Sequence, residues 1–347
     1  MTVRVDAPGE GVLKARSRNS GVLSPRVQVS EMQRARLLAA AVVAVEELGW
    51  SRVTVAGIAA RARVSRRTFY DLFDDREDCL LAVCEDTTGR IAAEIATVIA
   101  AKDEHLIWRE RVRTGLGVIL SFFDREPELA RFCVVQSTRG GRRVQGWREA
   151  LLTRLTEVIQ EGAPRRRARG AQVPSLTAEG LVGAVLAILH RRLCGSEREP
   201  LTGLLGALMS LIVLPYQGPA AARTERTRPI PSPVTVTPSA PDTMRVYSAG
   251  RDPLAEVPMR LTYRTARVLQ AAIEHPGASN RTLGEQADIH DQGQISKLLT
   301  RLENLGLLAN TGQGHAKGEP NAWHLTHLGK NITQQLALNT NPQTDTP

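Results

Sequence analysis

Prolines are concentrated in one part of this chain. Nine of its 19 prolines lie between Pro215 and Pro258, where the sequence includes RPIPSPVTVTPSAP. Proline lacks a backbone N–H and has a fixed φ, so closely spaced prolines disfavour both a long helix and a central strand. We therefore expect residues 216–257 to form an extended, semi-rigid linker between separately folded parts.

The remaining sequence divides into folded blocks and polar ends. A chain of 347 residues is long enough for two or three domains. Its first 29 residues show no hydrophobic period and carry five Lys or Arg against two acids, a net charge of +3. We expect a flexible basic arm at 1–29, folded blocks at 30–80, 81–215 and 258–335, and a polar tail at 336–347.

The composition is that of an ordinary globular protein, with 42% hydrophobic and 23% charged residues. The longest nearly uncharged apolar run, residues 201–215, is shorter than the roughly 18 residues of a membrane-spanning helix. The N-terminus lacks the apolar core of a secretory signal. These features predict a cytoplasmic protein that does not enter a membrane.

Sequence signatures of catalysis and of metal binding are missing. The four cysteines, at 79, 84, 133 and 194, form no CxxC pair, so we expect reduced, mostly packed thiols. There is no Walker loop, GxGxxG, GxSxG or HExxH motif. We expect no enzyme, no cofactor and no metal, although an enzyme in the middle block controlled by DNA stays an alternative.

Three predicted helices make up the first block. Ala35, Leu38, Ala39, Val42 and Val45 recur at helical spacing, in a helix that Ser30 can cap and Gly49 can end. Thr54 can cap a short helix with Val55, Ile58 and Ala59 facing inward. Ser65 can cap the next one, in which Phe69 and Phe73 face the core, and Asp74 or Asp75 a longer helix. Only Arg63 and Val64 separate the two short helices, which predicts a helix-turn-helix.

The charge of this segment agrees with DNA binding. The chain carries a formal net charge of +9, and residues 51–70 contain five arginines and no acid. In a helix-turn-helix the second helix enters the major groove, where arginine can pair with guanine and helix N-termini can bind phosphates. The candidate DNA-binding residues are Thr54, Ser65, Arg66, Arg67, Thr68 and Tyr70.

The first block resembles the DNA-binding domain of the TetR family of transcriptional regulators. The resemblance lies in ELGW, in VTVAGIAARARVSRRTFYDLF with its Tyr-x-x-Phe spacing at Tyr70 and Phe73, and in DDREDCLLAV. It implies that Arg76, where the family usually has a lysine, binds a phosphate. It also implies a homodimer that places two recognition helices in successive major grooves of a roughly palindromic operator.

The middle block reads as helices throughout. The resemblance implies an effector-binding and dimerisation domain, whose last helices, within 175–215, pack against their twins. Their broad apolar surface and Gly183, Gly203 and Gly206 agree with close helix approach, while a core within one chain is the alternative. The candidate residues of a ligand pocket, each of which is more often plain core, are Trp108, Phe122, Phe123, Phe132, Gln136 and Trp147.

The third block predicts three helices followed by a β-hairpin. We expect the first helix to end near Glu274, Thr282 to cap the second, a third to follow Asp291, and LGLLAN and AWHLT to form the strands. The block resembles MarR-type winged-helix domains. The candidates for a second DNA contact are Gln292, Gln294, Ser296, Lys297 and Arg301, with His315 and Lys317 on the wing.

The partner of the third block is left open by its charge. Eight Lys or Arg face six acids over residues 258–333, so a protein partner competes with DNA. His315, His324 and His327 suggest a metal only weakly, because no cysteine or carboxylate completes a site.

The sequence thus predicts a mainly α protein: a TetR-like helix-turn-helix, a helical effector and dimerisation domain, a linker and a C-terminal winged helix. The predicted function is a transcriptional regulator that binds double-stranded operator DNA, a repressor released by a small-molecule effector. An architectural protein that bridges DNA without an effector is the alternative.

Overall fold

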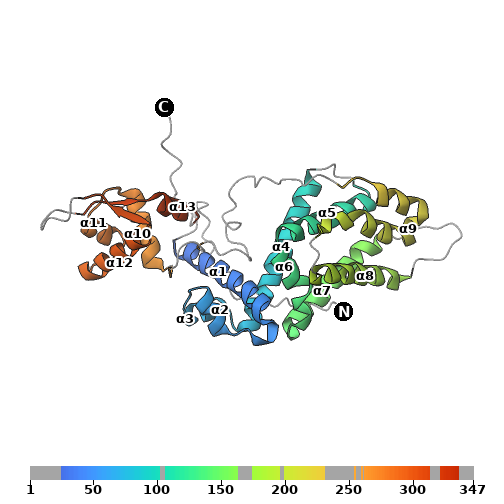
Figure 1. Cartoon of the computed structure of the whole chain (residues 1–347), viewed down its shortest axis with the longest axis horizontal. Helices are drawn as coiled ribbons and strands as arrows, with labels where there is room; N and C mark the ends of the chain where they lie inside the picture. Colours follow the sequence, from blue (N-terminus) through green and yellow to red (C-terminus); the bar gives the residue numbers. More distant parts are fainter. Residues whose placement is uncertain are drawn as a thin grey trace, which may run out of the picture.

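The computed structural model is mainly α-helical, with one two-stranded sheet among the residues that it describes (Figure 1). These residues are 25–101, 106–162, 174–195, 199–230, 254, 259–260, 262–312 and 321–335. The helix-turn-helix comprises α1 (Pro25–Leu48), η1 (Trp50–Arg52), α2 (Val55–Arg61) and α3 (Arg66–Leu72). We call the C-terminal body the described residues from 254 onward.

The helices of the middle block lie beside the helix-turn-helix, on the right in Figure 1. The predicted block boundary between residues 80 and 81 falls inside one continuous helix, α4, which Asp75 caps. This helix therefore belongs to both blocks. The elements are α4 (Arg76–Ala100), α5 (Trp108–Arg125), α6 (Pro127–Val134), η2 (Gln136–Arg139), α7 (Arg142–Gln160), α8 (Ser175–Cys194), η3 (Leu201–Leu204) and α9 (Leu205–Thr227).

The C-terminal body contains the predicted three helices and hairpin, followed by a further helix. Strand β1 pairs antiparallel with β2, with Leu308 opposite Leu325. Helix α12 follows Asp291 as expected, and the side chain of Asp291 caps it. The expected cap Thr282 is wrong, because Ser279 caps α11 and Thr282 donates its backbone N–H to the Ser279 hydroxyl. The elements are α10 (Tyr263–Glu274), α11 (Asn280–Gln286), α12 (Gln292–Asn304), β1 (Leu308–Asn310), β2 (Trp323–Leu325) and α13 (His327–Gln335).

The start of α1 differs from the prediction. The helix begins at Pro25 instead of Ser30, so the last residues of the expected arm, 25–29, are helical. Proline is tolerated in the first turn of a helix, where its missing N–H has no partner in any case. Val29 and Met32 extend the buried face that Ala35 belongs to, which gives these additional turns something to pack against. Residues 1–24 lie outside the described part.

The end of α9 also differs. The expected linker begins at residue 216, yet Tyr216, Ala222 and Glu225 are buried within a helix that runs to Thr227. Gly218, with φ 82° and ψ 178°, interrupts this helix. Pro219 opens the second leg, a position where proline removes no helical hydrogen bond. The linker prediction is therefore wrong for residues 216–227.

The two legs of α9, Leu205–Gln217 and Pro219–Thr227, fold back on each other. A Cβ added to Gly206 in the first leg would lie 2.9 Å from the carbonyl oxygen of Arg226 in the second. By length and composition alone, residues 201–227 could cross a membrane, since a window of 18 residues within them has a mean hydropathy of 1.4. The chain reversal leaves each leg shorter than the roughly 18 residues that crossing requires. This segment is a helical hairpin that packs on α5 and α8.

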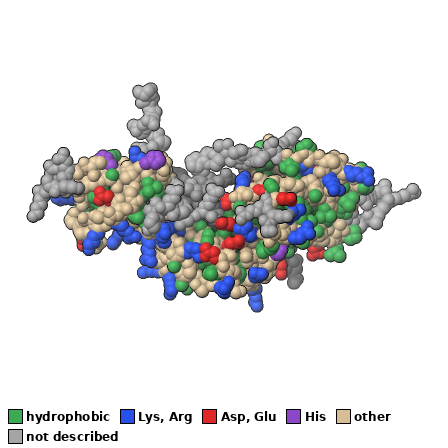
Figure 2. Space-filling model, viewed as in Figure 1, with side chains coloured by type: hydrophobic (Ala, Val, Ile, Leu, Met, Phe, Trp, Pro, Cys, Tyr) green, Lys and Arg blue, Asp and Glu red, His purple; other side chains and the backbone are tan. Residues whose placement is uncertain are grey.

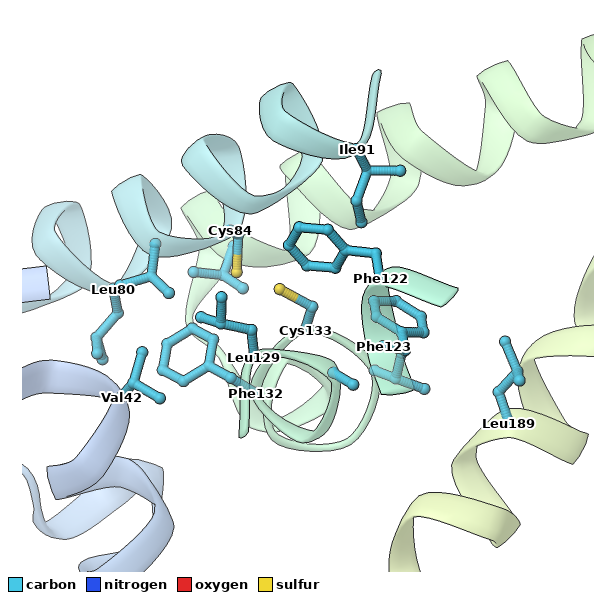
Figure 3. Packing of buried hydrophobic residues seen from close by; sticks show 14 of the residues in the cluster. Val42, Leu80, Cys84, Ile91, Phe122, Phe123, Leu129, Phe132, Cys133 and Leu189 are labelled. Atoms are coloured by element: carbon cyan, nitrogen blue, oxygen red, sulfur yellow. The ribbon is translucent and has the colours of Figure 1, made fainter. Parts of the chain in front are cut away.

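Two hydrophobic cores hold the described residues. The larger core runs from the C-terminal part of α1 to α9, and Figure 3 shows Phe122, Phe132, Cys84 and Cys133 within it. The smaller core fills the C-terminal body and also includes Val29, Met32 and Ala35 of α1. Helix α1 therefore contributes to both cores.

Candidate nucleic-acid interface

Local hydrogen bonds form the turn between α2 and α3. The side chain of Thr54 accepts a hydrogen bond from the backbone N–H of Gly57 at 3.0 Å, and Ser65 accepts one from Thr68 at 3.0 Å. Both predicted caps are confirmed. Arg63 adopts a positive φ of 53°, which lets Val64 return its N–H to Ala59 and tighten the connection. Between the capping residues Ala62 and Ser65, the connection therefore needs only Arg63 and Val64.

Aromatic side chains orient α3. Phe69 and Phe73 are buried in the larger core, with ring centroids 5.5 Å apart, as their i, i+4 spacing predicts. Because these rings fix one side of the helix inward, Arg66, Arg67 and Tyr70 lie on the outside. Tyr70 is 59% exposed, a high value for a large aromatic side chain. The exposed side of α3 is thus the one that carries the predicted base-reading residues.

The other arginines of residues 51–70 are not equivalent. Arg61 forms an ion pair with Glu47 of α1, and the Arg52 Nε donates to the carbonyl of Leu48 at 2.7 Å. Arg66 and Arg67, in contrast, make no ion pair or hydrogen bond with any residue that the structure describes. Their positive charges are therefore available to a ligand.

Three of the predicted DNA-contacting side chains, those of Ser65, Thr68 and Arg76, form hydrogen bonds within the protein. The hydroxyls of Ser65 and Thr68 lie 2.8 Å apart and are half-buried. Arg76 donates from Nη1 to the carbonyl of Val53 at 2.9 Å, which ties the start of α4 to the segment before α2. In this structure these three side chains stabilise the motif. Thr54 is exposed beside them.

Helix α12 presents a second polar surface. Ile295, Leu299 and Leu302 are buried, so the opposite side of the helix faces outward. Arg264 of α10 donates to Gln294 at 3.2 Å. The predicted candidates that lie exposed on α12 are Gln292, Gln294, Ser296, Lys297 and Arg301. The wing candidates His315 and Lys317 lie outside the described residues.

None of the six pocket candidates lines the cavity that opens between α7 and α8 in the described part of the chain. Phe122, Phe123 and Phe132 are core residues, and the Trp108 Nε1 donates to the carbonyl of Val158 at 2.8 Å. The open cavity between α7 and α8 measures about 770 Å³ and is lined by none of the six, Gln136 and Trp147 included. Its lining includes Glu149, Glu157, Glu161 and Glu179, which the sequence does not single out because surface glutamates on a helix form no distinctive pattern.

No group of three His, Cys, Asp or Glu side chains that could hold a metal occurs among the described residues. His324 and His327 lie within this part of the chain, whereas His315 does not. Three of the four cysteines are buried and Cys194 is exposed.

Residues 37–83 match the family model described as bacterial regulatory proteins of the tetR family. This range begins within α1 and ends within α4, so it spans the complete α2–turn–α3 unit. No curated protein sequence matches the chain.

Several solved structures are similar at low identity. The regulator FadR from Bacillus subtilis, in complex with stearoyl-CoA, is 18% identical, covers 53% of this chain and 97% of its own, and gives a TM-score of 0.45. A TetR-like regulator from Rhodococcus sp. RHA1 is 23% identical, with 52% and 94% covered and a TM-score of 0.41. RolR in complex with resorcinol is 22% identical, with 60% and 99% covered and a TM-score of 0.39.

These TM-scores are too low to support an argument about function, so the assignment comes from the family model and the geometry of α2 and α3. The matched family consists of regulatory proteins rather than enzymes, in agreement with the expectation from the sequence. The N-terminal domain of this chain is a TetR-family helix-turn-helix, a DNA-binding domain of transcriptional regulators.

Proposed function

We propose that the chain is a sequence-specific transcriptional regulator of the cytoplasm and nucleoid, a repressor whose DNA binding is released by a small-molecule effector. The observation that carries this proposal is the outward side of α3. There Arg66 and Arg67 lie exposed beside Tyr70 and have no partner among the described residues. Arginine at this position of a helix-turn-helix can donate two hydrogen bonds to guanine in the major groove.

Arg67→Ala tests this assignment. Duplexes enriched from a random-sequence library with the full-length chain serve as the operator, and binding is measured at one salt concentration. The variant should lose about 1–3 kcal/mol of binding free energy and relax specificity at one base pair. Arg154→Ala, which removes the same charge from the exposed side of α7, is the matched control. Unchanged affinity and selectivity in Arg67→Ala would refute the role of α3.

Dimerisation through α8 and α9 is part of the proposal. Leu176, Gly180, Gly183 and Ala187 lie exposed along one side of α8, at the spacing of a single helix face. A side chain at Gly183 would meet nothing within 4 Å inside the protomer. Gly183→Arg should therefore leave the protomer folded but block close approach of a second copy. Sedimentation should show a wild-type dimer and a monomeric variant, and a dimeric variant would contradict this interface.

The effector would act through α4. This helix begins beside the helix-turn-helix, where Arg76 contacts Val53, and extends along α5 and α7 in the middle block. A ligand shifts the equilibrium between two arrangements only if it binds one of them more tightly. A compound that stabilises the middle block and weakens operator binding would meet this requirement. The free energy by which the compound weakens operator binding must equal the free energy by which the operator weakens binding of the compound.

The second candidate function is an architectural protein that bridges DNA with two heads. The exposed polar side of α12 favours it, because Lys297 and Arg301 provide a further basic surface. Such a protein would bind random and selected duplexes with similar affinity, whereas a regulator prefers the selected ones. The predicted winged helix, with either DNA or a protein as its partner, belongs to both candidates.

A further inference from the structure

Helix α1 joins the helix-turn-helix to the C-terminal body. Its N-terminal half supplies Val29, Met32 and Ala35 to the core of the C-terminal body, and its C-terminal half supplies Leu38 and Val42 to the larger core. Helices α1 and α10 are in contact, and Figure 1 shows α1 between the two parts. Because an α-helix is stiff over this length, a domain that packs on one half has a defined orientation relative to the other.

Polar contacts reinforce this joint. Arg36, whose side chain is only 1% exposed, donates from Nη1 to the carbonyl oxygen of Met259 at 2.9 Å. The guanidinium of Arg26 lies 4.9 Å from the ring centre of Tyr263, within the range of a cation–π interaction. Docking removes the Arg36 guanidinium from water, which costs free energy, and its hydrogen bond to the Met259 carbonyl offsets part of that cost and fixes where Met259 lies against α1. The contacts involve both ends of the N-terminal half of α1.

The docked arrangement places α3 and α12 along the same edge of the molecule. In Figure 1 α12 lies at the lower edge of the C-terminal body, and α3 lies at the lower edge of the helix-turn-helix, below α1. Figure 2 shows Lys and Arg side chains gathered along this edge, below the C-terminal body and the helix-turn-helix. The exposed basic residues of these elements are Arg66 and Arg67 on α3, Arg264 on α10, and Lys297 and Arg301 on α12.

We propose that α3 and α12 of one chain form a single DNA-binding surface of fixed geometry, held by the contact between α1 and the C-terminal body. The partner of the C-terminal body is then the double-stranded DNA that flanks the half-site bound by α3. This inference rests on the proposed function, since it assumes that α3 contacts DNA. On this proposal the position of the C-terminal body is set by Arg36 and its neighbours on α1, and the linker alone does not determine it.

Hydroxyl-radical footprints of the full-length chain on the selected duplexes test the proposal. The wild type should protect an inner half-site and a flanking segment at a constant distance from it. Lys297→Glu with Arg301→Glu should remove the flanking protection and keep the inner one. The slope of log affinity against log salt should fall by about 0.9 for each phosphate that the variant no longer neutralises. Both residues are exposed, so the variant should fold.

Two control variants distinguish a failure of the proposed role of α3 from a failure of the proposed role of α12. Arg154→Glu reverses a charge on α7 and should change neither protection nor slope. Arg66→Ala with Arg67→Ala should remove the inner protection, and its persistence would refute the role of α3 in the proposed function, on which this inference rests. No flanking protection in the wild type, or flanking protection that survives the α12 charge reversal, would overturn the inference and favour a protein partner.

A longer linker tests the fixed geometry. Inserting about ten Gly and Ser residues after residue 240 lengthens the connection without altering α1, α10 or the described contacts between them. A docked domain should keep its flanking protection at the same distance. Flanking protection that spreads over a range of distances would show that the linker sets the position, and would overturn the role of α1.

Discussion

Glu225, in the second leg of α9, should be essential for the stability of the middle block. Its carboxylate is fully buried and faces three arginines: the Arg113 Nη1 at 2.8 Å, the Arg109 Nε at 3.3 Å and the Arg228 Nη1 at 3.7 Å. Glu225→Gln keeps the shape of the side chain and removes its charge. The three positive charges then lose the carboxylate that they share.

The expected loss follows from the partners that remain. Removing one member of a buried ion pair costs about 3–5 kcal/mol, because the other charge stays buried and unpaired. Arg113, itself buried, keeps carbonyl acceptors at Arg228, 3.2 Å away, and Pro229, 2.9 Å away. Arg228 keeps its pair with Glu110, at 2.6 and 3.0 Å, and this pairing lowers the pKa of Glu110. We therefore expect the lower end of the range, about 3 kcal/mol.

Urea unfolding followed by circular dichroism measures this loss. A chain with several domains unfolds in more than one step, so each variant is compared with the wild type transition by transition. The matched control is Glu285→Gln, whose partner Arg281 is 81% exposed, and it should cost less than about 1 kcal/mol. Replacing Arg113 and Glu225 together by Met should recover much of the loss, since no buried charge is left unpaired.

The reasoning would be refuted if Glu225→Gln were no more destabilising than Glu285→Gln. That result would mean that the second leg of α9 is not held by this carboxylate. The variant with Met at both Arg113 and Glu225 could instead be as unstable as Glu225→Gln. That result would show that the geometry of the ion pair between Arg113 and Glu225, rather than the compensation of charge, stabilises α9.

Three further predictions concern packing and titration. Gly206→Ala should lower the melting temperature by the equivalent of about 1–3 kcal/mol, since its Cβ would approach the Arg226 carbonyl, whereas Gly203→Ala, with open space around it, should have little effect. Native protein should react with a thiol reagent at Cys194 alone, because the other three thiols are buried and burial raises the pKa of Cys79 to about 12. A second reactive thiol would contradict the packing of the larger core, part of which Figure 3 shows. Asp75→Ala should cost about 1 kcal/mol at neutral pH, since it removes a helix cap. The N–H of Asp78 holds the pKa of Asp75 below 3.8, so the stabilisation is complete above pH 3.8 and should disappear from the unfolding curves as the pH falls through the lowered pKa.

Features that depend on neighbouring residues could be predicted from the sequence. Thr54, Ser65 and Asp291 cap helices because each accepts a hydrogen bond from the backbone N–H three residues ahead. The burial of Phe69 and Phe73 follows from their spacing on one helix. Even here local reasoning failed once, because Thr282 and Ser279 both have a hydroxyl and the choice between them depends on where the helix starts.

The α9 hairpin shows why the proline content placed the start of the linker too early in the sequence. Proline disfavours a helix interior, but Pro219 follows directly after Gly218, where a new leg begins. The second leg is then stabilised by its contact with Gly206 and by the ion pair of Glu225 with Arg113. Arg113 and Glu225 are 112 residues apart, and no local pattern links them.

The sequence pattern around Arg36 does not identify the partner of this side chain. An arginine within the apolar run of α1 predicts an exposed position or a partner, and the partner is a backbone carbonyl 223 residues away. A linker of any composition sets only the distance that a domain can reach, whereas a shared helix sets its direction. The orientation of the C-terminal body therefore does not follow from the proline-rich segment that precedes it. It depends on the N-terminal half of α1, which the sequence assigned in part to a flexible arm.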